Sequence, residues 1–515
     1  MDINKNLDFN INIFDEIYKD CGDIVGRKFP VFKNSGISAY VICIDNMANR
    51  DVVDLAIMRG LMVDIRLTTP YSGFDDTVIY DTLKNNGIIT SDMSEADSID
   101  AINDAILAGN TALLIDGFSK AIIISTKGFP GRGVQNADTE VVVQGSKEAF
   151  SEGMRVNTAL IRKRIKDTNL KVYQTIVGEK TKSDVAVMYL KGVVREEILN
   201  DVLQRIDKIS IDAVLDSGQV EQLIEDDWVS PFPQVQSTER PDKAASAILE
   251  GRIVIIVDNS PFVLIVPATM NVFFQSSEDY YGRWEIMSFV RAIRYLAGIM
   301  ALLLPALYVA ITLYHPSMIP LFLSFKIAGE RSAVPFSVVG ELIIMEIAFE
   351  MLKEAGIRLP GPIGGTMGIV GGIIIGSAAV EAGLITPIVV IIVALTEVAS
   401  FAIPHVSLVA GVRLVKYLIL VFAACFGFLG FWIGLLLVMI HMVNLKSFTV
   451  PYMFPYVAGD VNNFNDMKDS IFRLPMFMMK RKPIFANPNP TLKHGMQSES
   501  RNRISDVLSD SKPRF

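Results

Sequence analysis

The feature that most constrains this chain is a long stretch that is nearly free of charge. Between residues 292 and 444, only 14 of 153 residues are Asp, Glu, Lys or Arg, seven of each sign. In the other 362 residues about 25% are charged, as in an ordinary soluble protein. A chain of 515 residues divided in this way joins a soluble part to a membrane part. It is neither a purely cytosolic protein nor a disordered one.

The sign of the charge separates the same parts. Residues 1–291 carry a net charge of −13, residues 292–444 balance to zero, and residues 445–515 carry +5. A front part this acidic is a poor candidate for nucleic-acid binding, which needs a basic face. No basic start followed by an apolar run opens the chain, so we expect no cleaved signal peptide and a cytoplasmic N-terminal domain.

The soluble part reads as an α/β fold, because short β-branched runs alternate with amphipathic segments. The predicted strands are 38–44, 111–115, 121–125, 172–177, 185–190, 253–257 and 262–266. The predicted helices are 51–60, 148–166 and 195–207. Two halves, roughly 36–145 and 170–275, each end in a strand, an Asp-led turn and a strand, which indicates a duplicated architecture.

The domain organisation follows from these patterns. We expect an N-terminal extension (1–35), an α/β subdomain with a linking helix (36–165) and a second α/β subdomain (166–285). An α-helical transmembrane domain (286–445) and a cytoplasmic tail (446–515) complete the chain, and the end of the tail reads as disordered.

Nothing in the sequence indicates an enzyme, a cofactor or a metal centre. The loop 128–133 is rich in glycine but opens no helix, so both the dinucleotide and the P-loop fingerprints fail. No catalytic motif pairs a nucleophile with a base. The cysteines and the four histidines stand singly, without the spacing of a metal site or a disulfide framework.

Four stretches are long and apolar enough to cross about 30 Å of hydrocarbon. They are 295–314, 363–379, 384–404 and 417–443. A fifth segment, 334–352, is apolar but carries three glutamates, so it spans, re-enters, or lies at the interface. Basic residues before the first span and in the tail place both ends in the cytoplasm. That requires an even number of crossings, for which we expect four, although Arg413 and Lys416 then lie on the wrong side.

The second of these stretches has the sharpest internal pattern. Gly364, Gly368, Gly372 and Gly376 recur every four residues and therefore share one side of a helix. Such a smooth side either allows tight helix packing or lines and gates a pore between subunits. We treat the four glycines as pore or gating candidates.

Ionisable groups at membrane depth are costly and are functional candidates by default. Glu397 lies deepest, and Glu341, Glu346 and Glu350 cluster in the fifth apolar segment. On a helical wheel Glu346 and Glu350 lie close together and Glu341 lies nearly opposite. Glu346 and Glu350 either form the wet face of an interfacial helix or belong to a ring of carboxylates that attracts cations. Glu397 either makes a hydrogen bond inside the bundle or contributes to such a path.

Four or five spans are few for a solitary transporter, and no internal repeat is visible. A conduction path therefore requires several copies of the chain or a partner.

Ordered motifs along nearly the whole chain carry a resemblance to a known family. They include Ser-Pro-Phe-Pro-Gln at 230–234, Thr-Glu-Arg-Pro-Asp-Lys at 238–243, Leu-Glu-Gly-Arg at 249–252, Val-Pro-Phe at 334–336 and Arg-Leu-Pro at 358–360. In these residues the sequence resembles the A subunit of spore germinant receptors, the GerA family.

The resemblance implies a subunit of a nutrient receptor in the inner membrane of a dormant spore. Its partners would be a transporter-like B subunit and a lipoprotein C subunit. Copies of the A subunit would assemble into an oligomer, such as a pentamer, that forms a ligand-gated cation channel and begins germination. The alternative is a non-conducting membrane scaffold that couples a nutrient-sensing partner to the germination machinery.

Overall fold

The computed structural model describes residues 1–31, 37–65, 80–84, 87–90, 92–128, 140–358, 376–457, 466–475 and 483–487. The chain divides into two compact units. The first comprises Met1–Asp226, Val235–Ala268 and the tail from Met479, and the second comprises Asp227–Gln234 and Thr269–Met478. The first unit is α/β and the second is mainly helical, so the predicted fold class is confirmed.

The α/β unit contains two five-stranded antiparallel sheets with the same topology. The first has the order β1-β2-β4-β5-β3 and the second β6-β7-β9-β10-β8. The strands of the first sheet are β1 (Ile24–Pro30), β2 (Ser38–Ile44), β3 (Met93–Ala96), β4 (Thr111–Ile115) and β5 (Ala121–Ile124). Those of the second are β6 (Leu170–Val177), β7 (Ser183–Leu190), β8 (Gln236–Thr238), β9 (Ile253–Val257) and β10 (Val263–Val266). Each strand of the first sheet therefore has a counterpart at the same position in the second sheet, as the predicted duplication requires.

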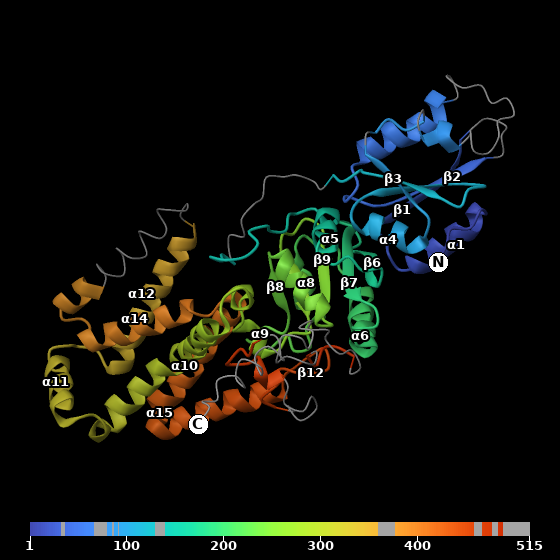
Figure 1. The fold of residues 1–515 in the computed structure, drawn as a ribbon. Helices are drawn as coiled ribbons and strands as arrows, with labels where there is room; N and C mark the ends of the chain where they lie inside the picture. The colour runs from blue at the N-terminus through green and yellow to red at the C-terminus, as the bar shows by residue number, and fades with distance from the viewer. Residues whose placement is uncertain are drawn as a thin grey trace, which may run out of the picture. The chain divides into compact units, whose positions relative to one another are not determined.

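Helices cover the sheets on both faces, as the fully buried central strands require. Figure 1 shows α1 (Leu7–Ile17) and α4 (Ile99–Leu107) on one face of the first sheet. Two π-helical turns, η1 (Val52–Met58) and η2 (Gly60–Asp64), cover the other face. Side chains cap the N-termini of α1 and α4. Asn6 accepts hydrogen bonds from the backbone amides of Asp8 and Phe9, and Ser98 accepts one from the backbone amide of Ala101.

The second sheet packs on α5 (Met154–Arg162) and α8 (Pro241–Leu249). Helices α6 (Glu196–Asp207) and α7 (Ser217–Ile224) complete this half. The tail returns to it, because Asn487 N donates to Val193 O at 2.7 Å and Phe485 lies under the Arg252 guanidinium.

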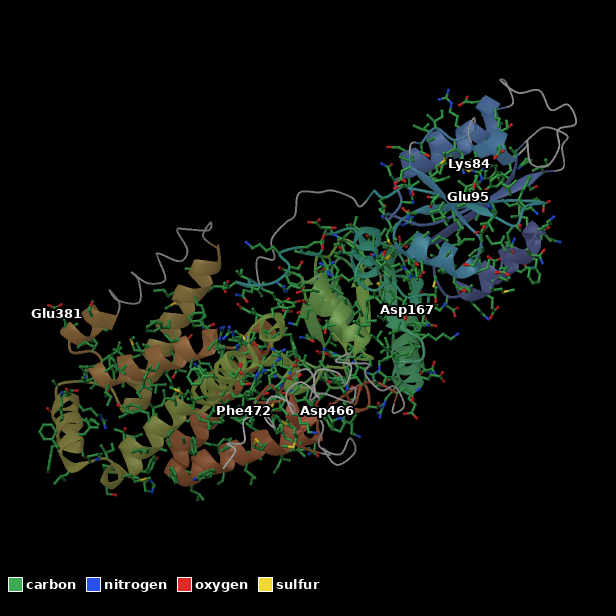
Figure 2. The ribbon with its side chains drawn as sticks, viewed as in Figure 1. Lys84, Glu95, Asp167, Glu381, Asp466 and Phe472 are labelled. Atoms are coloured by element: carbon green, nitrogen blue, oxygen red, sulfur yellow. The ribbon has the colours of Figure 1, made fainter. Side chains whose placement is uncertain are left out.

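Sequence patterns predict the central strands well and the peripheral elements poorly. Residues 24–30, assigned from sequence to an N-terminal extension, form β1 and pair with β2 along their whole length. Glu95 of strand β3 forms ion pairs with Lys84 at 2.6 Å and with Lys120 at 3.0 Å. Figure 2 labels Lys84 and Glu95. These edge strands lack the apolar runs by which a buried strand is recognised.

A buried ion pair joins the two halves of the α/β unit. Arg162 of α5 donates to Asp23, and both side chains are almost fully buried. The Nη2–Oδ1 distance is 2.8 Å. Lys171 Nζ adds a hydrogen bond of 2.7 Å to Ile17 O. Side chains from both halves therefore fix their contact.

The helical unit is built on two long apolar helices, α10 (Trp284–Tyr314) and α15 (Val406–Asn444), each long and apolar enough to cross a membrane. Shorter helices stand between them in the chain: α11 (Leu321–Arg331), α12 (Val338–Arg358) and α14 (Pro387–Phe401). Short elements precede and follow: α9 (Met270–Phe273), η3 (Ser277–Tyr280), η4 (Pro316–Met318), β11 (Lys446–Ser447), β12 (Val450–Pro451) and η6 (Asp466–Lys468).

The 39 residues of α15 form a hairpin of two helical arms, because the backbone reverses at Gly427 with φ 63° and ψ −137°. A Cβ placed on Gly434 would lie 3.2 Å from Ile419 Cα, and one on Gly430 only 1.9 Å from Phe422 O. In a continuous helix residues 419 and 434 would be about 22 Å apart. We call residues 406–426 the first arm and 428–444 the second arm.

The predicted span 417–443 therefore straddles this reversal. Tyr314, at the end of α10, donates to Ala424 O at 2.6 Å beside the turn. Sequence periodicity does not reveal the reversal, since both arms are apolar throughout and the contacts are tertiary.

We predict that a variant carrying Ile419→Cys and Gly434→Cys, in a Cys425→Ser background, forms an intramolecular disulfide on mild oxidation. The hairpin brings these two positions into contact, whereas a straight helix separates them beyond the reach of a disulfide. Mobility on denaturing gels with and without reductant measures the bond, and the two single variants are controls. Absence of the bond in the double variant would contradict the hairpin.

We also predict that Arg162→Met lowers the stability of the α/β unit by about 3–5 kcal/mol, because it leaves Asp23 buried and unpaired. Thermal unfolding followed by fluorescence measures the change. Lys180→Met is the matched control, since both side chains of its pair with Asp212 are largely exposed and the pair should contribute little. Equal effects of the two substitutions would refute the role assigned to Arg162.

Candidate functional site

Lys416 lies at the centre of a buried ion-pair network in the helical unit. It extends from the first arm of α15, and its side chain is only 4% exposed. Its ammonium donates to Glu346 of α12, which is also buried, and lies 3.6 Å from Glu397 Oε1 of α14. One lysine thus joins three helices.

The network continues through a second lysine and an arginine. Lys353 Nζ, near the end of α12, donates to Glu397 Oε2 at 2.5 Å. Arg413, one turn before Lys416, donates to Glu350 at the more exposed edge. We define the ion-pair network as Glu346, Glu350, Glu397, Lys353, Arg413 and Lys416. Its three carboxylates are matched by three cations, so the network is neutral.

Because these charges are buried, their pairing affects the stability of the helical unit. Removing an ion from water costs several kcal/mol even after the protein relaxes, and only a close partner offsets that cost. The partners come from different helices, so the packing of α12, α14 and the first arm is tied to their pairing. If one of these helices shifted relative to the others, a buried charge would lose its ion-pair partner.

Glu341 is placed differently from the other glutamates of α12. It is fully buried, and its Oε2 accepts hydrogen bonds from Thr386 N at 2.8 Å and Thr386 Oγ1 at 2.7 Å. No Lys or Arg of the described residues lies within salt-bridge distance of it. The helical wheel predicts this separation, because Glu341 faces the start of α14 whereas Glu346 and Glu350 face α15.

The glycine pattern falls largely outside the described residues. Gly364, Gly368 and Gly372 lie there, and their place in a pore stays a prediction. Gly376 is described, at the start of a short helical segment, and a Cβ on it would lie 3.2 Å from Val390 Cγ1 of α14. Close helix approach therefore occurs at this position.

Sequence reasoning selected the carboxylates but missed their cationic partners. The partners lie 19 to 70 residues away along the chain, so no local pattern joins them. One signal was available: Arg413 and Lys416 are three apart on one helix, and Glu346 and Glu350 are four apart on another. Both pairs present neighbouring charges of one sign on one helix face.

A second buried cluster anchors the start of α10. Arg291 is fully buried and donates to Asp279 Oδ2 at 3.1 Å and to Asp469 Oδ1 at 2.7 Å. Arg294 adds a contact of 2.7 Å to Asp279. Asp469 belongs to the segment after the hairpin, in which Figure 2 labels Asp466 and Phe472. These arginines therefore bind protein carboxylates.

The Ser-Pro-Phe-Pro-Gln motif packs against both arms of the hairpin. Ser230 Oγ and His441 Nε2 of the second arm share a hydrogen bond of 2.8 Å. Gly411 of the first arm lies so close to Pro231 O that a Cβ would be 2.3 Å away. Since the flanking residues belong to the α/β unit, this loop is a covalent link into the helical unit.

The described residues contain no group of three or more His, Cys, Asp and Glu side chains that could hold a metal ion. They offer an ion-pair network and apolar helices instead.

Comparison with known proteins assigns the family. The model of the Bacillus/Clostridium GerA spore germination protein family matches residues 12–485. The chain is 38% identical over 483 residues to the uncharacterized membrane protein YfkQ of Bacillus subtilis (strain 168), covering 93% of this chain and 91% of that protein. It is 37% identical over 473 residues to spore germination protein KA of the same organism, covering 92% and 85%.

The chain is also similar to a solved structure, the crystal structure of the N-terminal domain of the A subunit of the Bacillus megaterium spore germinant receptor GerK3. It aligns with a TM-score of 0.41 and 30% identity, covering 52% of this chain and 98% of that one. The family match and the relatives both extend over nine-tenths of the sequence. The chain belongs to the GerA family of spore germination proteins.

Proposed function

We propose that this chain is the membrane subunit of a nutrient receptor in the spore inner membrane and that its copies assemble into a ligand-gated cation channel. The observation that carries the proposal is the buried ion-pair network. Charges are rarely retained inside an apolar bundle unless they serve a function. A neutral network across three helices is suited to hold one arrangement of a gate.

The physics of the network favours two discrete states. With every charge matched, the closed arrangement is stable. A displacement of the first arm would separate Lys416 from Glu346 and Glu397 and expose the charges to each other or to water. A signal whose binding free energy offsets this cost opens the path. When the signal is lost, the ion pairs re-form and the path closes.

Assembly into an oligomer is the next part of the proposal. The helices carry large exposed apolar side chains, among them Leu296, Ile391, Leu414 and Leu436. Such patches are covered by lipid or by other protein. We propose that both cover them here: a bilayer on the outside, and further copies of the chain, five in all, together with a transporter-like B subunit and a lipoprotein C subunit.

The topology is proposed as follows: the α/β unit and the tail lie on the spore-core side. The Gly-rich stretch, Glu341 and the network are the pore or gating candidates. The whole assembly would release cations when a partner senses its nutrient.

A second function has one observation in its favour. Because Glu346, Glu350 and Glu397 each have a cationic partner, they present no open ring of carboxylates in the arrangement described. A non-conducting scaffold, whose helices only anchor a signalling domain, would also tolerate such a closed network.

We predict that Lys416→Met raises unstimulated potassium release from proteoliposomes containing the receptor on the order of tenfold or more. Unpairing a buried charge costs about 3–5 kcal/mol, and that cost falls on the closed state. The double variant Glu346→Gln with Lys416→Met should restore much of the closed state, since it removes a charge of each sign. Lys326→Met, on an exposed face of α11, is the control.

A scaffold predicts a different pattern for the same variants. Thermal stability would fall in Lys416→Met while ion release stayed at the control level. That result, with intact assembly, would contradict the channel.

We further predict that Gly368→Ala and Gly372→Ala alter gating, seen as potassium release without a stimulus. If the glycine side only packs helices, these small changes leave assembly and signalling normal. Comparing release with the amount of assembled receptor distinguishes the two, and normal behaviour of both variants would favour the scaffold.

A further inference from the structure

The outward side of α11 is apolar, although its 11 residues extend only about 16 Å and cannot cross a bilayer. Leu321, Phe322 and Phe325 are 72%, 85% and 71% exposed. Ala328 and Gly329 are exposed on the same side, since all five positions fall within an arc of about 120° on a helical wheel. A Cβ placed on Gly329 would have no neighbour within 4 Å among the described residues.

The other side of α11 packs on the protein or carries charge. Ile327 lies nearly opposite the centre of the apolar arc and is buried. Lys326, Glu330 and Arg331 all lie outside the arc. An apolar side rich in Phe and Leu beside a charged remainder is typical of a helix that lies in the plane of a membrane surface.

The place of α11 in the helical unit also indicates a membrane surface. It follows the end of α10, whose 31 residues extend about 46 Å, close to the full thickness of a bilayer with its headgroups. The hairpin of α15 reverses beside that end, since Tyr314 donates to Ala424 O. Two long apolar elements thus end or reverse at one level. In Figure 1, α11 runs across the direction of α10 rather than along it.

The size of the exposed side favours lipid over a second protein as its cover. A helix about 16 Å long and about 10 Å wide presents far less than the roughly 800 Å² that each partner buries in a stable interface. Water is a poor cover, because it would leave Leu321, Phe322 and Phe325 exposed together. Acyl chains can cover this side in any oligomer, and Lys326 at its border is long enough to reach the headgroups.

We propose that α11 lies in the membrane interface, with Leu321, Phe322 and Phe325 inserted among the acyl chains of one leaflet. Only residues 332–337 separate it from α12, so the inserted helix fixes the depth of α12 in the membrane. With the topology proposed above, this leaflet faces away from the spore core. The choice of leaflet and any effect on a gate rest on the proposed function, whereas the insertion itself does not.

Spin-label accessibility of the full chain in lipid nanodiscs tests the insertion. The native thiols are first removed by Cys21→Ser, Cys43→Ala and Cys425→Ser. A nitroxide is then attached in Phe322→Cys, Phe325→Cys or Lys326→Cys. Oxygen concentrates in hydrocarbon and a nickel chelate stays in water. We expect the ratio of oxygen to nickel collisions to be several-fold higher at the two phenylalanine positions than at Lys326, the matched control.

A second measurement keeps the native cysteines and stays informative if the thiol-free chain does not fold. Phe322→Trp and Lys326→Trp each add one tryptophan to the chain. Lipids brominated on their acyl chains should quench the fluorescence added by Phe322→Trp several-fold more strongly than that added by Lys326→Trp.

Three results would overturn the proposal. Nickel collisions that dominate at Phe322 and Phe325 would place this side of α11 in water. Few collisions with either reagent would place protein over it, such as a second copy of the chain. Equal quenching of the two added tryptophans would remove the difference in depth. Since neither measurement needs ion flow, a non-conducting chain with the lipid signature would refute the channel but not the insertion of α11.

Discussion

The arrangement of the helical unit depends on one lysine. Lys416 is buried among apolar helices, where an isolated ammonium would be too costly to keep. It is retained because carboxylates from α12 and α14 meet it. The need to pair these charges therefore fixes which helices touch and how far each helix is shifted along its axis relative to its neighbours. The same logic operates where α10 begins, since Arg291 is retained by Asp279 and Asp469. Apolar packing alone would allow these helices to slide, whereas each buried charge tolerates few positions.

Two kinds of buried carboxylate follow from this logic. Glu346 and Glu397 are neutralised by the protein and hold helices together. Glu341 is held instead by neutral donors, the Thr386 amide and hydroxyl at the start of α14. The two kinds look alike in the sequence and differ only in the partners that the fold brings to them.

The sequence predicts the soluble fold to a large extent and the helical unit only in part. Central strands such as β4 and β9 are recognisable because every residue is buried and all but Thr111 are apolar. The edge strands β1 and β3 expose most of their residues and depend on neighbouring strands for their conformation. The hairpin in α15 is hidden for another reason: two apolar arms and one long apolar helix have the same hydropathy. Only the glycines at 427, 430 and 434 hint at a turn and a close crossing.

The candidate site shows the same limit. Ionisable residues at membrane depth are visible from the sequence, and Glu341, Glu346, Glu350 and Glu397 were selected on that ground. Their chemistry depends on partners that are remote in sequence. Arg413 and Lys416 conflict with a topology that treats them as flanking charges. They are instead partners of Glu350 and Glu346 inside the bundle. Membership of the GerA family gives the biological setting, and the contacts give the physical proposal within it.

The most direct test of the central claim is a paired measurement on the wild-type chain purified in lipid with its partner subunits: the mass of the assembly and its cation conductance across a bilayer. The account predicts an oligomer of this chain that conducts monovalent cations when the receptor is stimulated. A strictly monomeric chain that conducts nothing, with or without its partners, would contradict it.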